Sequence, residues 1–338
     1  MIDESSPAAA VASDSGERRP VVWVPAPVAD DVVEALLAWA DVRLGWGDAA
    51  VAWSEVAPEV EGVLLRTARV DGDMMRQAPR LRIVARHGVG LDTVDTATAS
   101  ELGIDVTTTP TANSRSVAEL AVALIMTTRR GLGPVLAATG SRTPSSPERA
   151  SLVGRELAGA TLGLLGFGRI ARLVGDIARD GLGMRVVAHD PHLPDDAIRA
   201  GGAEPASLDD LLRASDVLSV HVPLTDGTRG LIGAREFALL PAGAVVVNTS
   251  RGGVLDEEAL VASLEHGHLA GAGLDVTARE PLPGDHPLRR RPDVVLTPHV
   301  GGQTREALAR VGHEAAGHLR RVLQAGRYLQ PDAATTGR

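Results

Sequence analysis

Short apolar runs alternate with helical patterns along almost the whole chain from residue 21 onward, and few folds accommodate such an alternation. The first series of runs is VVWVP at 21, GVLLR at 62, RIVAR at 82 and DVTT at 105, with the helical pattern DDVVEALLAWA at 30 after the first run. Parallel strands need a crossover between them, and a helix usually provides it. The first series therefore predicts an α/β domain with a parallel sheet.

A second series of apolar runs starts near residue 160. It consists of ATLGLLGFG at 160, MRVVAHD at 184, SDVLSVHVP at 215, GAVVVNTS at 243, LAGAGLDV at 269 and DVVLTPH at 293. Six strands with helices between them match the doubly wound nucleotide-binding, or Rossmann-type, pattern. We therefore expect fold class α/β with two doubly wound parallel-sheet domains, of which the first is flavodoxin-like.

Two amphipathic helices are predicted outside these series, over residues 114–131 and 303–326. We expect the first to bridge the domains. The second is too isolated to form a domain of its own, so we expect it to return to the first domain. A Pro-rich polar stretch at 142–149 predicts a loop.

These patterns predict four parts of the chain, one of them discontinuous. Residues 1–19 form a disordered lead and residues 331–338 a flexible tail. Residues 20–112 and 301–330 form the discontinuous first domain, and residues 113–300 form the Rossmann domain.

Composition excludes several classes of function. A formal charge of -9 and a pI near 5.6 argue against nucleic acid as a partner. All 34 basic residues are Arg, so Schiff-base chemistry and the Lys of a phosphate-binding P-loop are impossible. Cys is absent, which rules out disulfides and cysteine-ligated metals, and we expect no metal site. No stretch reaches the ~18 apolar residues of a membrane helix. We therefore expect a soluble, cytoplasmic protein.

A glycine motif follows the first strand of the second series. Gly166, Gly168 and Ala171 have the GxGxxA spacing between a strand and a helix, which suits a dinucleotide pyrophosphate. Asp190 ends the next strand, where a carboxylate can bind an adenosine ribose and repel the extra phosphate of NADP. The cofactor prediction is therefore NAD. The alternative is that Asp190 only caps the DPHLPDD turn.

Seven motifs in the chain occur in one family order. They are RHGVGLDTVD at 86, SVAELAVAL at 116, GFGRIA at 166, HVPLTDGTRGLI at 221, NTSRGGVLDEEAL at 248, GLDVTAREPLP at 273 and TPHVGG at 297. Over residues 60–325 the chain resembles the D-isomer-specific 2-hydroxyacid dehydrogenases, a family that includes phosphoglycerate, glycerate and D-lactate dehydrogenases. The resemblance implies an active-site cleft between the two domains.

The resemblance assigns a catalytic role to Arg251, Glu280 and His299. Arg251 would bind the substrate carboxylate and carbonyl oxygen, and His299 would be the acid and base. Glu280 would orient the imidazole. The plainer alternatives are a solvated strand-end arginine, a structural histidine and a surface glutamate.

The first domain would supply the rest of the substrate site. Gly88, Val89 and Gly90 resemble the family's substrate loop, whose backbone N–H groups hold a carboxylate, although a plain turn is the alternative. Arg66 matches a position near the substrate in some members and could bind a distal anionic group.

The resemblance also implies a set of cofactor contacts. Asp275 would contact the nicotinamide carboxamide, Val222 and Pro223 would lie along the adenosine side, and Thr249 would line the nicotinamide pocket. The full set is Gly166, Gly168, Arg169, Ile170, Asp190, Val222, Pro223, Thr228, Thr249, Asp275, His299 and Gly301. A homodimer through the NAD domain is the implied assembly.

Two departures from the family pattern affect partners and substrate. Residues 132–158 lack the usual Gly-x-Trp segment, so dimer contacts there can differ. Position 289, often Trp in relatives, is Arg289 and begins a run of three arginines. That run is either a solvated basic patch or an attractor for an anionic substrate.

Together these observations predict an NAD-dependent D-2-hydroxyacid dehydrogenase, or 2-ketoacid reductase, that acts on a small 2-hydroxy or 2-keto acid. The alternatives are a phosphite or other oxyanion dehydrogenase, and a non-catalytic NAD(H)-sensing corepressor.

Overall fold

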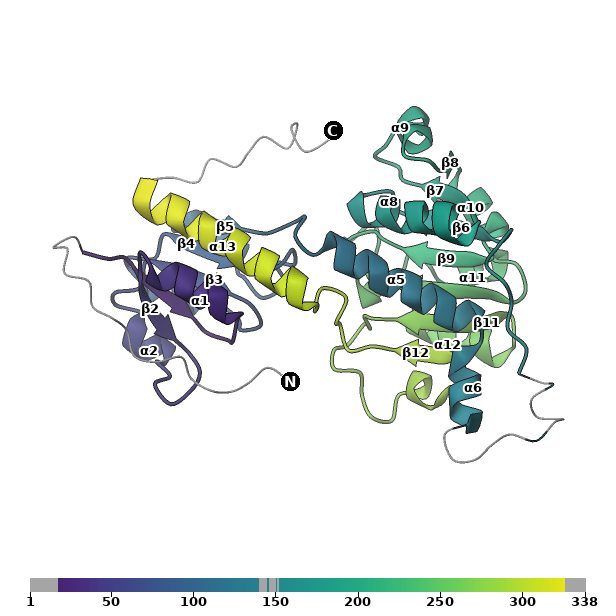
Figure 1. Cartoon of the computed structure of the whole chain (residues 1–338), viewed down its shortest axis with the longest axis horizontal. Helices are drawn as coiled ribbons and strands as arrows, with labels where there is room; N and C mark the ends of the chain where they lie inside the picture. Colours follow the sequence, from purple (N-terminus) through teal and green to yellow (C-terminus); the bar gives the residue numbers. More distant parts are fainter. Residues whose placement is uncertain (1–17, 140–144, 146–149, 151, 326–338) are drawn as a thin grey trace. The chain divides into compact units, whose positions relative to one another are not determined.

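A computed structural model describes residues 18–139, 145, 150 and 152–325. The chain divides into two compact units, which Figure 1 colours along the sequence. One unit contains the residues up to Asn113 and those from Thr304 onward, and the other runs from Ser114 to Gln303. Almost all of the expected lead, the whole expected tail and most of the Pro-rich loop lie outside the described residues.

The first unit is built on a five-stranded sheet in which every pair of strands is parallel, in the order β2-β1-β3-β4-β5. This is the flavodoxin-like order. The strands are β1 (Val21–Val24), β2 (Asp41–Leu44), β3 (Gly62–Leu65), β4 (Ile83–Arg86) and β5 (Asp105–Thr107). Strand β2 was not predicted, because it is a half-buried edge strand whose polar Asp and Arg interrupt the apolar run.

The helices of this unit are α1 (Asp30–Leu37), α2 (Trp53–Val56), α3 (Gly72–Arg76), α4 (Thr96–Glu101) and the long C-terminal α13 (Arg305–Ala325). Helix α13 lies directly on the sheet, since an ideal Cβ on Gly62 would be 2.7 Å from Leu319 Cδ2. Ala315 and Leu319 share a buried cluster with Leu64 and Ile83. The helix expected at 303–326 therefore packs on the unit formed by the N-terminal third of the chain.

The second unit contains a seven-stranded parallel sheet in the order β12-β11-β10-β9-β6-β7-β8. The strands are β6 (Thr161–Leu165), β7 (Arg185–His189), β8 (Glu204–Pro205), β9 (Val217–Val220), β10 (Ala244–Asn248), β11 (Leu269–Leu274) and β12 (Val294–Leu296). The chain order reverses between β6 and β9, as in the doubly wound dinucleotide-binding fold. The α/β fold class is confirmed. All six predicted strands are present. The seventh, β8, was not predicted because it is a two-residue edge strand with no apolar run.

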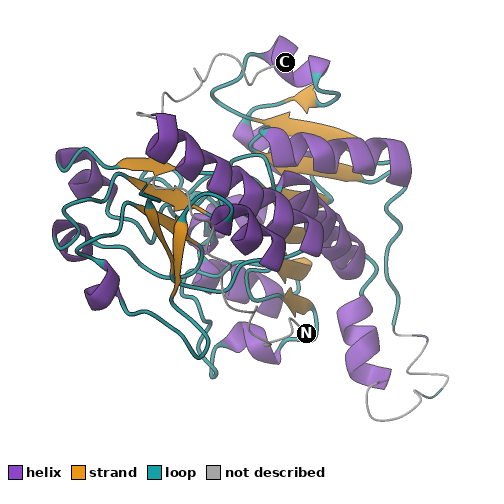
Figure 2. Ribbon diagram, turned by 60° about the vertical axis from the view of Figure 1, so that its left-hand side comes forward, coloured by secondary structure: helices purple, strands orange, loops and turns teal. Residues whose placement is uncertain are grey.

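Helices cover both faces of this sheet. Successive residues of a strand point to opposite faces, so Leu164 and Leu165 of β6 lie in different cores. Leu164 faces a core that contains residues of α5 (Ser114–Arg129) and α8 (Arg169–Asp176), which lie side by side in Figure 1. Leu165 faces the other core, which includes residues of α10 (Leu208–Ala214), α11 (Ala234–Leu239) and α12 (Glu257–Glu265). The remaining elements are α6 (Leu132–Thr139), η1 (Ile177–Gly181), α9 (Asp195–Ala200), η2 (Gly252–Val254) and η3 (Pro287–Arg290). Figure 2 shows the helices and strands in separate colours.

Within the described ranges, no single helix has the length and apolar character needed to cross a bilayer. Only α5 and α6 taken together satisfy that test by length and composition, and the two are bent by 68° at their junction.

Candidate active site

Every candidate residue in the second unit follows the carboxyl end of a strand. Because all seven strands are parallel, these ends lie along one edge of the sheet, which is where ligands bind in open α/β folds. The segments concerned begin at Gly166 after β6, Asp190 after β7, His221 after β9, Thr249 after β10, Asp275 after β11 and Thr297 after β12.

The glycine loop between β6 and α8 has little room on its inner side. Gly166 has φ +87°, and a Cβ there would lie 2.9 Å from Val222 Cγ1. Gly168 precedes α8, and a Cβ there would meet nothing within 4 Å, so the helix N-terminus opens to space that a phosphate can approach. Ala171 is completely buried on the inner face of α8. Arg169 and Ile170 form the first turn of α8, with Arg169 exposed.

Asp190 links this loop to the turn after β7. Its Oδ2 accepts a hydrogen bond from the Phe167 N–H (2.9 Å), and its Oδ1 accepts one from the His192 N–H (3.0 Å). The capping alternative therefore describes part of what Asp190 does, and each carboxylate oxygen keeps a further lone pair. A pocket of about 460 Å³ beside it is lined by Asp195 and Asp210 as well. Asp195 is paired with Arg199 at 3.3 Å and Asp210 with Arg213 at 3.7 Å, whereas Asp190 has no arginine partner among the described residues.

The segment after β9 is ordered by a turn around Thr228. The Thr228 hydroxyl donates to the Pro223 carbonyl at 2.6 Å and accepts from the Thr225 N–H at 2.8 Å. His221 is bonded through Nε2 to Ser219 Oγ at 2.8 Å, and burial lowers the pKa of its imidazole to about 4. This side chain supports the loop in its neutral form.

Arg251 lies on a turn that is organised by Asn248, a residue not identified from the sequence. The buried Asn248 amide donates to the Arg251 carbonyl (2.9 Å), and its Oδ1 accepts from the N–H and hydroxyl of Ser250. The Arg251 Nη1 donates to the Ser250 carbonyl at 2.8 Å. A polar residue at the end of the otherwise apolar run AVVVN was the available signal for Asn248.

Thr249 is 9% exposed, and its hydroxyl has no hydrogen-bond partner among the described residues. A buried hydroxyl without a partner is unfavourable by about 1–3 kcal/mol. The structure therefore has an unused polar group at the position expected to face nicotinamide.

The loops after β10 and β11 touch through their backbones. An ideal Cβ on Gly252 would lie 1.9 Å from the carbonyl carbon of Thr277, so only glycine fits there. The Glu257 Oε1 accepts from the Ala278 N–H at 2.6 Å and ties α12 to the same loop. Glu257 was also not identified from the sequence. These contacts fix the segment that carries Glu280.

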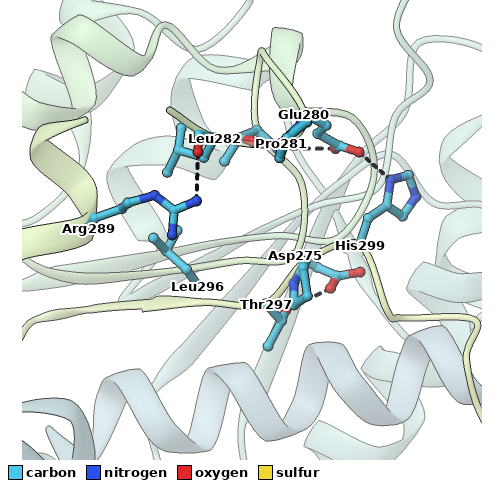
Figure 3. Close-up of a pocket in the computed structure, with 10 residues that line it drawn as sticks. Asp275, Glu280, Pro281, Leu282, Arg289, Leu296, Thr297 and His299 are labelled. Atoms are coloured by element: carbon cyan, nitrogen blue, oxygen red, sulfur yellow. Dashed lines mark hydrogen bonds and ion pairs between the residues drawn. The ribbon is translucent and has the colours of Figure 1, made fainter. Parts of the chain in front are cut away.

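His299 and Glu280 form a direct pair, with 2.8 Å between His299 Nδ1 and Glu280 Oε2 (Figure 3). Their side chains are 49% and 40% exposed, so the pair remains open to a ligand. His299 has φ +53°, the only positive φ of a non-glycine residue in the described chain. A non-glycine residue in this region costs about 1–2 kcal/mol, and the surrounding loop must hold it there.

Asp275 holds that loop. The carboxylate is 2% exposed and accepts from the Thr297 hydroxyl (2.6 Å) and from the N–H groups of Val300 and Gly301 (both 2.8 Å). The His299 N–H donates to the Asp275 carbonyl at 2.8 Å. The expected contact of Asp275 with nicotinamide stays a prediction beside this observed role as the loop's anchor.

A pocket of about 400 Å³ lies beside the histidine. Its lining includes Asp275, Glu280, Arg289 and His299, with apolar contributions from Leu282 and Leu296. Figure 3 shows Arg289 with its guanidinium directed at the Leu282 carbonyl. The three arginines of the run differ, because Arg291 pairs with Asp293 at 2.7 Å, and of the two exposed arginines only Arg289 lines the pocket.

In the first unit, the glycine loop expected to hold a carboxylate is partly engaged. The Gly88 N–H donates to Thr109 Oγ1 (3.1 Å) and to the Arg86 carbonyl (3.0 Å), and Gly88 has φ +136°. The amides of Val89 and Gly90 make no hydrogen bond with the part of the chain that the structure describes. Arg66 donates to the Pro27 carbonyl at 2.7 Å, and burial lowers its pKa. Of the three N–H groups, those of Val89 and Gly90 are the ones left for an anion.

Across the described residues, no group of three or more metal-ligating side chains was found.

Comparison with known proteins identifies the family. The model of the D-isomer specific 2-hydroxyacid dehydrogenase NAD binding domain matches residues 122–301. The chain is 40% identical over 320 residues to a D-3-phosphoglycerate dehydrogenase of Mycobacterium tuberculosis, a match that covers 94% of this chain and 59% of that protein. It therefore spans less than two thirds of the phosphoglycerate dehydrogenases it matches.

Two relatives are covered nearly end to end. A glyoxylate reductase of Aeropyrum pernix is 40% identical over 310 residues, which is 89% of this chain and 92% of that protein. The crystal structure of an NADPH-dependent glyoxylate/hydroxypyruvate reductase of Sinorhizobium meliloti aligns with a TM-score of 0.79 at 29% identity, over 94% of this chain and 99% of that one. The chain belongs to the D-isomer specific 2-hydroxyacid dehydrogenase family.

Proposed function

We propose that the chain is an NAD(P)-dependent 2-hydroxyacid dehydrogenase, working in reverse as a 2-ketoacid reductase, on the D-configured alcohol. The observation that carries the proposal is the pair of His299 and Glu280, held at the carboxyl edge of a dinucleotide-binding sheet. A carboxylate fixes the tautomer and stabilises the imidazolium of a histidine that transfers protons.

The residues have distinct tasks in this proposal. His299 takes the hydroxyl proton when the substrate is oxidised and returns a proton to the carbonyl oxygen when it is reduced. Arg251 binds the carboxylate and carbonyl oxygen with its planar fork of donors. The backbone at Gly88, Val89 and Gly90 would complete the carboxylate site, with the N–H groups of Val89 and Gly90 as its donors and Gly88 as its turn. In this assignment residues 20–112 and 301–330 form the substrate domain, and residues 113–300 form the NAD domain.

The residues at the sheet edge fit a dinucleotide. The open space at Gly168 and the unpartnered hydroxyl of Thr249 are the features that a pyrophosphate and a nicotinamide would use. When bound, the cofactor accepts or supplies the hydride. Val222, Pro223, Thr228, Asp275 and Gly301 complete the proposed contacts.

NAD is the proposed form of the cofactor. In this proposal Asp190 binds the adenosine ribose, and its carboxylate disfavours an additional phosphate. Asp195 and Asp210 line the same pocket but are paired with Arg199 and Arg213. The relative from Sinorhizobium meliloti is NADPH-dependent, so both cofactors need to be compared directly.

A homodimer through the NAD domain is the proposed assembly. Met126 on α5 and Leu132 and Leu136 on α6 are exposed apolar side chains, and Val153 is 81% exposed. In a homodimer through this domain, these side chains would be removed from water. Sedimentation of the protein, with Leu136→Asp as the disrupting variant, tests the homodimer.

A cytoplasmic location also stays a prediction.

A panel of small 2-keto acids with NADH and NADPH, followed by loss of the reduced cofactor's absorbance, tests the enzyme proposal. Turnover of at least one keto acid with NADH is expected. Turnover of phosphite with NAD⁺ and of no keto acid would favour an oxyanion dehydrogenase. Cofactor binding without turnover of any of these would favour the sensing alternative.

A further inference from the structure

The pocket beside His299 contains one permanent positive charge. Of its ten lining residues, Asp275 and Glu280 are acidic, and Arg289 is the single arginine. The Asp275 carboxylate is engaged by three hydrogen bonds, and Glu280 by His299. Arg289 has no carboxylate within 4.0 Å among the described residues. Its charge is therefore not neutralised by the residues around it.

The guanidinium of Arg289 is held from one side only. Its Nε donates to the Pro283 carbonyl at 2.9 Å and its Nη2 to the Leu282 carbonyl at 2.6 Å. The described residues offer Nη1 no hydrogen-bond partner. The N–H groups of Nη1 and the second N–H of Nη2 can therefore donate two parallel hydrogen bonds to an anion. The bonds to the two carbonyls fix the orientation of the guanidinium for this contact.

The neighbouring arginines do not share this arrangement. Arg291 forms an ion pair with Asp293 at 2.7 Å and donates a hydrogen bond to the Leu264 carbonyl. Arg290 is exposed, as Arg289 is, but it is absent from the pocket lining. The run is thus neither a uniform solvated patch nor a uniform attractor, and one of its members borders the pocket that contains the imidazole.

We propose that Arg289 is a specificity-determining residue that binds a second anionic group of the substrate. The substrate class is then a 2-keto or 2-hydroxy acid with a carboxylate, sulfonate or phosphonate at the far end from C1. This inference rests on the proposed function. A pocket of about 400 Å³ accommodates an acid of four or five carbons, whose C2 oxygen would meet His299 and whose far anionic group would meet Arg289.

The test compares keto acids that differ only in the second charge. Oxaloacetate is paired with 2-oxobutyrate, and 2-oxoglutarate with 2-oxovalerate, while sulfopyruvate and phosphonopyruvate distinguish the kind of anion. The variants are Arg289→Ala, Arg289→Lys and, as the matched control, Arg290→Ala. The control removes the same charge from the same run, so long-range attraction is lowered equally in both alanine variants.

Arg289→Ala is expected to lower kcat/KM for the dianionic acids about tenfold through KM, as expected for a lost charge-assisted contact of an exposed group. The monoanionic acids and the Arg290→Ala protein should change less than about twofold. Arg289→Lys should recover part of the loss, because it keeps the charge without the fork. An equal loss for both members of each pair would overturn the proposal and leave Arg289 as a support of the 282–283 backbone.

A binding experiment separates this inference from the function on which it rests. Calorimetry of oxaloacetate and 2-oxobutyrate with the protein saturated with NAD⁺ needs no turnover, since no reduced cofactor is present. Tighter binding of oxaloacetate that Arg289→Ala abolishes supports the anion site even if no keto acid is reduced. Equal affinity of the two acids, or a preference that Arg289→Ala leaves unchanged, overturns it even if the reductase activity is real.

Discussion

The Nδ1 atom of His299 lies 2.8 Å from the Oε2 atom of Glu280. A carboxylate only accepts hydrogen bonds, so Nδ1 carries the shared proton and Nε2 is the nitrogen left to face a substrate. The imidazole is therefore oriented before any ligand binds.

Replacing His299 by Ala removes the proposed proton carrier. We expect kcat to fall by about 10²- to 10⁴-fold, the usual contribution of a positioned acid or base. The affinity for NADH, followed by fluorescence, should change by less than about twofold because the glycine loop is intact. His266→Ala, at an exposed position on another loop, is the control. Near-normal rates in His299→Ala would refute the assignment.

Replacing Glu280 by Gln keeps the size of the side chain and removes its charge. The imidazolium then loses its partner, and we expect kcat to fall about tenfold to a hundredfold with little change in NADH affinity. Glu258→Gln, an exposed residue on α12, removes the same charge elsewhere and should be neutral. Equal effects of the two substitutions would mean that the pair has no catalytic role.

Asp190 should set the choice of cofactor. We expect kcat/KM with NADH to exceed that with NADPH by at least about tenfold, because the carboxylate repels a ribose phosphate. Asp190→Ser should narrow the ratio, mainly by lowering the KM for NADPH. Ser can still accept one hydrogen bond from the glycine loop. A native preference for NADPH would contradict this prediction.

Gly252 should tolerate no side chain. A Cβ would overlap the Thr277 backbone, so Gly252→Ala must displace the loop that carries Glu280. We expect a loss of stability of about 1–3 kcal/mol, as for other overpacked sites, together with a loss of activity. Gly284→Ala is the matched control, since its Cβ would meet nothing within 4 Å. Urea unfolding of the two variants gives the comparison.

Stability should fall on mild acidification. Burial lowers the pKa of His221 to about 4, and burial with the nearby Arg66 and Arg86 charges lowers the pKa of His87 to about 4. The unfolded chain titrates near pH 6.5, so between about pH 4 and 6.5 it binds more protons than the folded chain.

The free energy of unfolding should accordingly be highest above pH 6.5 and decrease as the pH falls below it. The decrease is up to about 3 kcal/mol for each histidine at pH 4. His221→Gln should reduce the slope of this decrease by up to one proton. Urea titrations from pH 4.5 to 7 measure it. An unchanged slope in the variant would show that His221 does not drive the effect.

The sequence predicted the parts of the fold that depend on local pattern. Strands β6 and β10 are largely apolar runs, and each begins within one residue of the start of the predicted run. Strands β2 and β8 were missed because edge strands need little apolar surface. The positions of Gly166 and Asp190 followed from the motif, whereas the bond from the Phe167 N–H to Asp190 did not.

The missed parts of the site depend on contacts between segments distant in sequence. Asn248 acts within its own turn, but Glu257 reaches Ala278 and Asp275 reaches Gly301. No spacing rule predicts such pairs, because the sheet brings their loops together only after folding. Arg289 is similar, since its position beside the histidine pocket depends on bonds to the carbonyls of Leu282 and Pro283.

The pairing of β11 with β12 gives the histidine loop its alignment. Leu274 is paired with Leu296, and Asp275 and Thr297, each one residue further on, are joined by a 2.6 Å bond. A slip of one residue would move the loop by about 3.3 Å and turn its side chains to the opposite face. The distance between the His299 imidazole and the Glu280 carboxylate therefore depends on the register of the apolar pairs between β11 and β12. A substitution that leaves a cavity between these two strands would shift the histidine loop and lower activity, although no polar side chain is changed.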